Sequence, residues 1–331
     1  MNSSDLPALL QGFFTGKLVI QRQASPATVA SYRDTFTLLL AFAAARAGRQ
    51  PHQLQVTDLD AEAIGGFLTH LEKERGSSIP TRNARLAAIR SFFRYAALHD
   101  PRHAQLIAQV LAIPAKRAGK ATVTWLTRPE TEALTTAPDR GTWHGRRDHA
   151  LLLTAVHTGL RVSELTGLTI ADTHLGDGPH LRCHGKGRKE RCTPLTPDAA
   201  KILRAWLKER GGQPEDPLFP SRRGTRLSRD AVARLVAVHA ETAARACPSI
   251  AGKHVTPHTL RHSTAMALLR AGVDTSVIAL WLGHESPETT QAYLHADMEI
   301  KNRALARVNP PGGTPGRYSP PDSLIAYLKT L

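Results

Sequence analysis

Several short segments of this chain carry side chains suited to phosphate binding and acid–base chemistry. In the first, Arg161 lies in the sequence Thr-Gly-Leu-Arg-Val-Ser-Glu-Leu, where it follows a helix break at Gly159 and opens a short helix. A planar guanidinium at that point can bind a phosphate through two hydrogen bonds, beside backbone N–H groups. A surface arginine paired with Glu164 is the alternative, and this segment alone favours the alternative.

The second segment is a predicted hairpin turn in which Lys186 stands between two glycines. Alternating sequences predict strands at residues 181–184 and 190–195, and the turn also carries Arg188 and Lys189. A flexible tip of this kind can place an ammonium group in a groove of DNA. A Walker-type nucleotide loop is excluded on spacing, because both its first glycine and its final Ser or Thr are replaced.

The third segment is His-Thr-Leu-Arg-His directly after Pro257. His258 and Arg261 are three residues apart, so they share one face at the start of a helix. Zinc is the alternative, because His258 and His262 have the spacing of a metalloprotease helix. Thr259 occupies the position of the general-base glutamate, however, and this disfavours a metal site.

The fourth segment is Leu-Gly-His ending at His284, followed nine residues later by Tyr293. A tyrosine among helical neighbours usually packs in a core, and a histidine after glycine usually caps a helix. Taken singly, each residue therefore favours an ordinary structural role. Together, the four segments bring phosphate-directed and acid–base groups into one chain, and their joint occurrence favours a functional site.

The composition limits the classes of protein to which this chain can belong. The 331 residues are enough for two domains, and 43 Lys+Arg against 28 Asp+Glu give 43 − 28 = +15, which favours a polyanionic partner such as nucleic acid. The three cysteines are too few and too scattered for a disulfide framework and fit a reducing cytoplasm. Neither an export signal nor a membrane-spanning apolar stretch is indicated.

The patterning predicts a mainly α protein with a small antiparallel β element, an α+β fold. Residues 1–112 read as a helical domain, and the Pro-containing basic stretch 113–122 as a linker. Residues 123–308 form a second domain that mixes helices with the predicted hairpin. Residues 309–331 form a Pro/Gly tether and a short apolar helix that could dock on a neighbouring subunit or on its own.

Three helices are expected in the first domain. One begins at Pro26 and ends near Gly48, and a second begins near Asp60. The third runs from Pro80 to about Leu98. Its apolar stripe consists of Leu86, Ile89, Phe93 and Ala97, flanked by Arg82, Arg85, Arg90 and Arg94. Arginines beside a buried stripe are often only a solvated face, so the pattern alone leaves DNA contact open.

This set of motifs resembles the tyrosine recombinase, or phage-integrase, family of bacterial mobile elements. The family's catalytic domains carry Arg, Lys, His-x-x-Arg, His or Trp, and Tyr in this chain order. The matching residues are Arg161, Lys186, His258, Arg261, His284 and Tyr293. The first domain is similar to the family's SAM-like core-binding domain. That likeness makes the four arginines of the third helix expected DNA contacts. Arg188 and Lys189 of the hairpin turn are expected DNA contacts as well.

The resemblance implies an enzyme, a site-specific DNA recombinase that acts through a 3′-phosphotyrosyl intermediate and a Holliday junction. Tyr293 would be the nucleophile, Lys186 the general acid and His258 the proton acceptor. The two motif arginines and His284 would stabilise the negative transition state. Neither a metal nor a nucleotide cofactor is expected, because fixed positive side chains carry that charge and the tyrosyl ester keeps the bond energy.

The expected partner is double-stranded DNA with inverted-repeat recombination sites, bound by a homotetramer on two sites, with or without partner recombinases. The expected location is the bacterial cytoplasm, at the nucleoid, with no membrane association. Integration or transposition of a mobile element is the favoured role. The alternatives are type IB topoisomerase-like activity, Xer-like dimer resolution, a non-catalytic DNA-binding regulator and, least favoured, a metal-dependent hydrolase.

Overall fold

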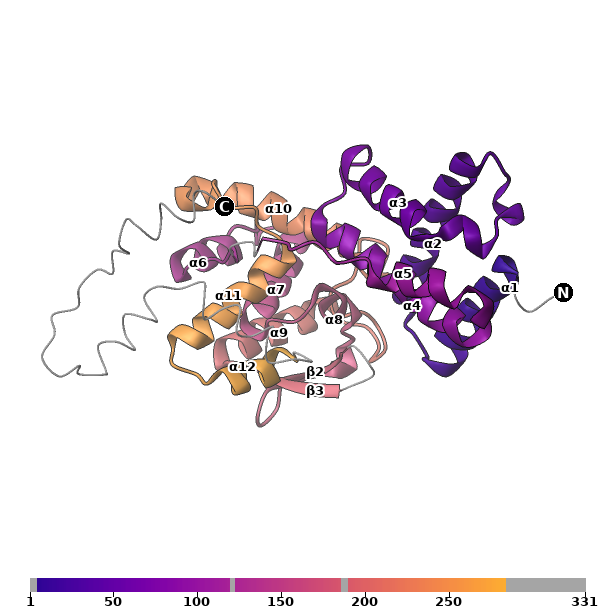
Figure 1. Cartoon of the computed structure of the whole chain (residues 1–331). Coiled ribbons are helices and arrows are strands. Elements are labelled where there is room, and N and C mark those ends of the chain that lie inside the picture. Colours follow the sequence, from indigo (N-terminus) through magenta and orange to yellow (C-terminus); the bar gives the residue numbers. More distant parts are fainter. Residues whose placement is uncertain (1–4, 120–122, 186–189, 284–331) are drawn as a thin grey trace, which may run out of the picture. The chain divides into compact units, whose positions relative to one another are not determined.

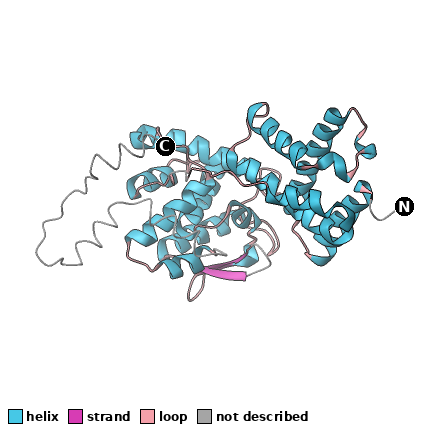
Figure 2. Ribbon diagram, viewed as in Figure 1, coloured by secondary structure: helices cyan, strands magenta, loops and turns pink. Residues whose placement is uncertain are grey.

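The computed structural model describes residues 5–119, 123–185 and 190–283. The chain divides into two compact units, residues 1–120 and 121–331. Both are built mainly from helices, and one small sheet lies in the second unit (Figures 1 and 2). The predicted mainly α fold with a small antiparallel β element is thus confirmed.

The first unit contains the three predicted helices and others besides. Its longer helices are α1 (Leu6–Gln11), a π-helix (Gly12–Gln21), α2 (Pro26–Ala47), α3 (Ala61–Lys73), α4 (Ile79–His99) and α5 (Ala104–Ala112). Ser25 caps α2 by accepting a hydrogen bond from the Thr28 N–H, and Gly48 ends it in the left-handed conformation, with φ of 63°. Asp60 caps α3 through the Ala63 N–H in the same way. The caps therefore form where the sequence predicts them.

Aromatic rings form the centre of the first unit. Phe13, Phe67, Phe92 and Phe93 are fully buried, and the ring of Phe13 meets that of Phe92 edge to face at 5.6 Å between centroids. The stripe of α4 needs one correction. Ala97 is exposed and its neighbour Ala96 is buried, because the stripe continues from Phe93 by a step of three residues rather than four.

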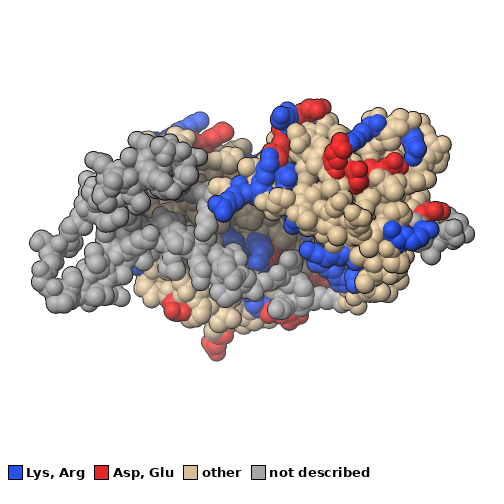
Figure 3. Space-filling view, viewed as in Figure 1, with Lys and Arg blue, Asp and Glu red and all other residues tan. Residues whose placement is uncertain are grey.

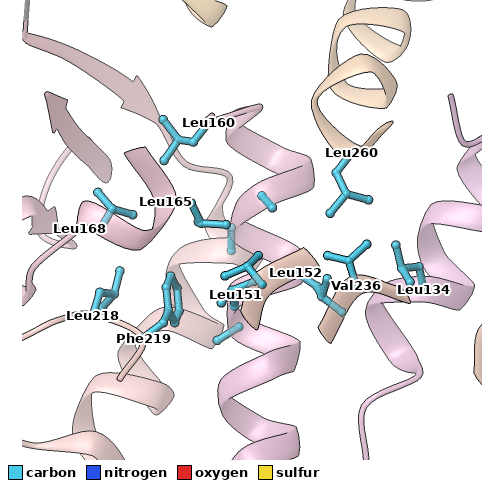
Figure 4. Packing of buried hydrophobic residues seen from close by; sticks show 14 of the residues in the cluster. Leu134, Leu151, Leu152, Leu160, Leu165, Leu168, Leu218, Phe219, Val236 and Leu260 are labelled. Carbon is cyan, nitrogen blue, oxygen red and sulfur yellow. The ribbon is translucent and has the colours of Figure 1, made fainter. Parts of the chain in front are cut away.

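The second unit is arranged around α7 (Trp143–Thr158). Its other helices are α6 (Arg128–Thr136), α8 (Val162–Gly167), α9 (Pro197–Arg210), α10 (Arg229–Ala246), α11 (Pro257–Arg270) and α12 (Thr275–Leu282). Leu151 and Leu152 of α7 lie in the middle of the core, where Figure 4 shows them among apolar side chains from neighbouring elements. Helices α6, α9 and α11 pack against α7. A buried central helix of this kind fixes the positions of both of its ends.

The sheet has three antiparallel strands in the order β1 (Thr173–His174), β2 (His180–His184) and β3 (Glu190–Pro194). The predicted hairpin of β2 and β3 is confirmed, and Cys183 lies opposite Arg191 in its register. Strand β1 was not predicted, because two residues are too few to show alternation. Cys183 is buried and Cys192 is exposed, and neither is in a disulfide. The Cys183 thiol donates a hydrogen bond to the Arg191 carbonyl.

Within the described ranges, no helix is both long enough and apolar enough to cross a bilayer. Figure 3 shows Lys and Arg side chains at several places on one face of the molecule, with fewer acidic groups among them. This distribution agrees with the excess of basic residues in the sequence.

Candidate active site

Arg161 is held at the junction of α7 and α8. Helix α7 ends at Gly159, with φ of 63°, and Arg161 is the extended residue that caps α8. Its backbone N–H donates to Glu164 Oε2 at 2.8 Å and its Nη1 to Glu164 Oε1 at 2.9 Å. Its Nη2 donates to the carbonyl of Gly283 at 2.7 Å. The side chain keeps 29% of its surface exposed, so a ligand can still reach it.

Arg261 is the buried counterpart of Arg161 and lies on the first turns of α11. Thr256 caps this helix by accepting a hydrogen bond from the Thr259 N–H. The Arg261 side chain donates from Nη1 to the Gly159 carbonyl at 2.7 Å and from Nη2 to the Leu282 carbonyl at 2.8 Å. It therefore ties the end of α7 to the end of α12.

The two arginines meet at the end of α12. Their acceptors there are the carbonyls of adjacent residues, Leu282 for Arg261 and Gly283 for Arg161. The approach is close: a Cβ added to Gly159 would lie 2.5 Å from Leu282 Cδ2. Glycine is therefore required at 159 both by its positive φ and by the space available. The chain passes next into His284, so the arginines from two distant segments converge where that motif begins.

The histidines of α11 differ in environment. His258 is exposed on the first turn, and its ring centroid lies 6.4 Å from that of the half-buried His262. Burial, helped by the positive potential of His258 and Arg261, lowers the pKa of His262 to about 4. Among the described residues, no group of three or more His, Cys, Asp or Glu side chains could hold a metal ion.

Five of the residues predicted from the sequence lie outside the described residues. They are Lys186, Arg188, Lys189, His284 and Tyr293. The strands β2 and β3 that flank the first three are described, as is Gly283, which precedes His284 (Figure 1). The structure thus brings Arg161 and Arg261 together and places His258 on the same helix as Arg261.

Glu164 and Arg191 form a cluster with Arg161 whose extent the sequence did not reveal. The sequence offered Glu164 only as a surface partner of Arg161, yet 3% of its side chain is exposed. Arg191 of β3 donates to both of its oxygens, at 3.0 and 2.8 Å. Burial alone would raise the pKa of Glu164, but hydrogen bonds from Arg191 and Arg161 lower it below its usual value. The three-residue spacing from Arg161 was the available signal.

The four arginines of α4 differ in exposure. Arg82 is buried, donates from Nη1 to the Pro114 carbonyl at 3.3 Å and lies 3.2 Å from Glu72. Arg90 is half-buried and donates from Nη2 to the Ile113 carbonyl. Arg85 is half-buried as well, and Arg94 is exposed. Among the four, Arg94 is thus the most accessible to a ligand.

A second basic cluster was not singled out from the sequence. It lies at and before the start of α10 and consists of Arg222, Arg223, Arg226 and Arg229, all exposed. Four arginines within eight residues, followed by Asp230, were a readable signal of local positive charge. The cluster adds to the basic surface of the second unit.

Comparison with known proteins gives two family matches. Residues 124–299 match the phage integrase family, and residues 12–99 match the phage integrase N-terminal SAM-like domain. Together these two regions cover most of both units. They match the two types of domain expected from the sequence.

Individual relatives agree over nearly the whole chain. The protein y4rC of Sinorhizobium fredii, provisionally named an integrase/recombinase, is 53% identical over 99% of each chain. The tyrosine recombinase XerC of Pelobacter propionicus is 36% identical over 90% of this chain and 94% of its own.

Among solved structures, XerH site-specific recombinase bound to palindromic difH substrate matches with a TM-score of 0.68. It is 23% identical, and the match covers 86% of this chain and 81% of that one, so it bears on the fold alone. The family matches and the relatives carry the assignment. The chain belongs to the phage integrase family and is a tyrosine-type site-specific recombinase.

Proposed function

We propose that the chain cleaves and rejoins DNA by transesterification at Tyr293. The Tyr293 oxygen attacks the scissile phosphorus, the bond from phosphorus to the 5′ oxygen breaks, and a 3′-phosphotyrosyl ester forms. The observation that carries the proposal is that Arg161 and Arg261 converge on three carbonyls, those of Gly159, Leu282 and Gly283. Two cations are thereby fixed beside the residue that precedes His284.

Fixed positive charge is what this reaction requires. The pentacoordinate state carries more negative charge than the phosphodiester, and donors already held in place stabilise it without reorganising. Arginine suits this role because it does not lose its proton at any ordinary pH. In the proposal, Arg161 and Arg261 bind the two non-bridging oxygens and His284 adds a third donor. This arrangement supplies the charge for which other nucleases use metal ions.

Proton transfer falls to two further residues. His258 accepts the proton of the Tyr293 hydroxyl, and its exposed position on the first turn of α11 leaves it accessible. Lys186, on the hairpin between β2 and β3, gives a proton to the departing 5′ oxygen. The ester conserves the bond energy, so the 5′ hydroxyl of a partner strand can reverse the reaction without ATP. Two such exchanges pass through a Holliday junction.

The proposed substrate is double-stranded DNA with inverted-repeat sites, bound by four copies of the chain on two sites. Arg94 and Arg85 on α4, with Arg188 and Lys189, are the proposed phosphate contacts of the predicted set. Arg82 and Arg90 would act less directly, because their side chains hold the segment after α5. The exposed arginines at the start of α10 extend the basic surface. Such a substrate places the enzyme at the nucleoid, in the bacterial cytoplasm.

The proposed biological role is integration or transposition of a mobile element. The likeness to y4rC, named an integrase/recombinase, supports this role over others. Xer-like dimer resolution is the second candidate, favoured by the 36% identity to XerC. Type IB topoisomerase-like activity uses the same chemistry, and its readout is plasmid relaxation without recombinant products.

The test is covalent capture. The protein is incubated in EDTA with nicked suicide duplexes that carry the ends of its host element, and adducts are resolved on denaturing gels. We expect an adduct with the native chain and with the matched control Tyr318→Phe, and none with Tyr293→Phe. An adduct that persists in Tyr293→Phe, or cleavage that demands a divalent metal, would overturn the proposal.

A further inference from the structure

Arg191 contacts both attachment points of Arg161. It lies on β3, 14% of its side chain is exposed, and it makes two hydrogen bonds to Glu164. It also packs on Gly283, since a Cβ added there would lie 2.7 Å from Arg191 Nη1. Glu164 and the Gly283 carbonyl are the two groups that hold the Arg161 side chain. From β3, Arg191 therefore contacts both Glu164 and Gly283.

The carboxylate of Glu164 is shared equally between the two arginines. Oε1 accepts from Arg161 Nη1 and Arg191 Nη1, and Oε2 accepts from the Arg161 backbone N–H and Arg191 Nη2. A buried carboxylate is stable only when its oxygens are bonded and its charge is paired. Half of its bonds come from Arg191. Without that residue, Glu164 would be an under-bonded anion that binds Arg161 in a different geometry.

We propose that Arg191 is a positioning residue for Arg161 that acts through Glu164. It holds the Arg161 guanidinium at the position where it meets the scissile phosphate, and it links that position to the hairpin that carries Lys186. The proposal rests on the role of Arg161 in the proposed function. In this role Arg191 need not touch DNA, because it acts on the carboxylate that holds Arg161.

The charges around Glu164 make the expected effect of losing Arg191 depend on pH. The groups that face it are Arg161 from α8, Arg191 from β3 and the Cys183 thiol from β2. Hydrogen bonding to Arg191 is foremost among the effects that lower the pKa of Glu164, while burial raises it. Loss of Arg191 therefore raises the pKa of this carboxyl. Protonated Glu164 would hold Arg161 more weakly, so cleavage by an Arg191 variant should fall off at a higher pH than in the native chain.

The experiment measures single-turnover cleavage of the suicide duplex at saturating protein. We expect Arg191→Met to cleave about 10- to 100-fold more slowly with unchanged duplex affinity, and Arg191→Lys to recover part of the rate. The matched control is Arg210→Met on α9, which removes another buried arginine, one bound to the Pro217 carbonyl. Melting temperatures measured at each pH identify the conditions under which each variant is folded. The control should lose stability but keep its cleavage rate and pH profile.

A double-mutant cycle with Glu164→Gln separates action through Glu164 from independent action. If Arg191 acts through Glu164, the double variant cleaves about as slowly as Glu164→Gln alone. Effects that multiply would overturn the inference, as would a native rate or an unshifted pH profile in Arg191→Met. If the native chain itself forms no adduct, the proposed function fails. If the native chain forms one and folded Arg191 variants match it, only the inference about Arg191 fails.

Discussion

Each unit contains a carboxylate that binds two basic side chains, and the two clusters have different consequences. In the second unit, Glu164 is 3% exposed and is shared by Arg161 and Arg191. In the first, Glu72 is 21% exposed, lying 3.2 Å from Arg82 and 2.8 Å from Lys116. The two clusters differ in the acceptors that the other N–H groups of their arginines bind. Those of Arg161 reach the Gly283 carbonyl, and those of Arg82 reach the segment after α5.

The cluster in the first unit binds the segment after α5, residues 113–116, to α4. Arg90 and Arg82 donate to the carbonyls of Ile113 and Pro114, and the side-chain amide of Asn83 bonds both the N–H and the carbonyl of Lys116. Residues 113–116, predicted as linker, are thus bound to the helix along its polar side. Arginines that look alike in a sequence can serve a ligand or the chain's own backbone, and their acceptors decide which.

The largest expected effect comes from removing Arg261. Arg261→Met should slow adduct formation by about 100- to 1,000-fold, because it removes a fixed transition-state donor and frees the carbonyls of Gly159 and Leu282. Single-turnover cleavage measures it. Arg261→Lys should be nearly as slow, since one ammonium cannot reproduce the two-armed contact. A folded Arg261→Met that cleaves at the native rate would contradict the proposed site.

An intermediate effect separates Arg94 from Arg82. Arg94→Ala removes an exposed cation, so we expect roughly tenfold weaker duplex binding. The slope of log affinity against log salt concentration should also become shallower by about one, because one fewer counterion is released. Arg82→Met should instead lower the free energy of unfolding by about 1–3 kcal/mol, because it removes a buried guanidinium that donates to the Pro114 carbonyl and pairs with the partly buried Glu72.

Fluorescence anisotropy at several salt concentrations, paired with urea unfolding, measures both variants. The distinction fails if Arg82→Met changes the salt slope as much as Arg94→Ala does while stability stays native. It fails equally if Arg94→Ala binds like the native chain.

The smallest effect concerns His262 and pH. Its pKa is lowered from 6.5 in the unfolded chain to about 4 in the fold, so the unfolded state binds the proton more readily between these values. Its contribution to stability is therefore present above pH 6.5 and is lost as the pH falls towards 4. The melting temperature of His262→Asn should therefore change less with pH over that window than that of the native chain, and the difference should be a few degrees at most. Parallel pH dependence in both proteins would show that His262 titrates normally.

Much of the fold could be read from local signals. The caps at Ser25 and Asp60 and the glycines at 48 and 159 are short-range features, so the helix ends they predict agree with the structure. Strand β1 has only two residues, too short for a pattern. The apolar stripe of α4 was assigned one position off, because a period of 3.6 residues permits either neighbour.

The site was predictable in part. The order and spacing of the motifs single out Arg161, His258 and Arg261 among 43 basic Lys and Arg residues and 16 histidines. What they could not supply is long-range bonding. The contacts of Arg161 and Arg261 with Gly283 and Leu282 join residues far apart in the chain, and the burial of Glu164 depends on β3. The different roles of the α4 arginines likewise depend on where the segment after α5 lies.

Peptide mapping of the covalent adduct tests the central claim most directly. The adduct formed in EDTA is trimmed with nuclease, digested with trypsin and analysed by mass spectrometry. Residues 271–301 form one tryptic peptide, and Tyr293 is its only tyrosine. We predict that this peptide alone gains a nucleotide mass, with fragment ions that place it on Tyr293. Modification on another tyrosine, or on a serine or histidine, would contradict the account.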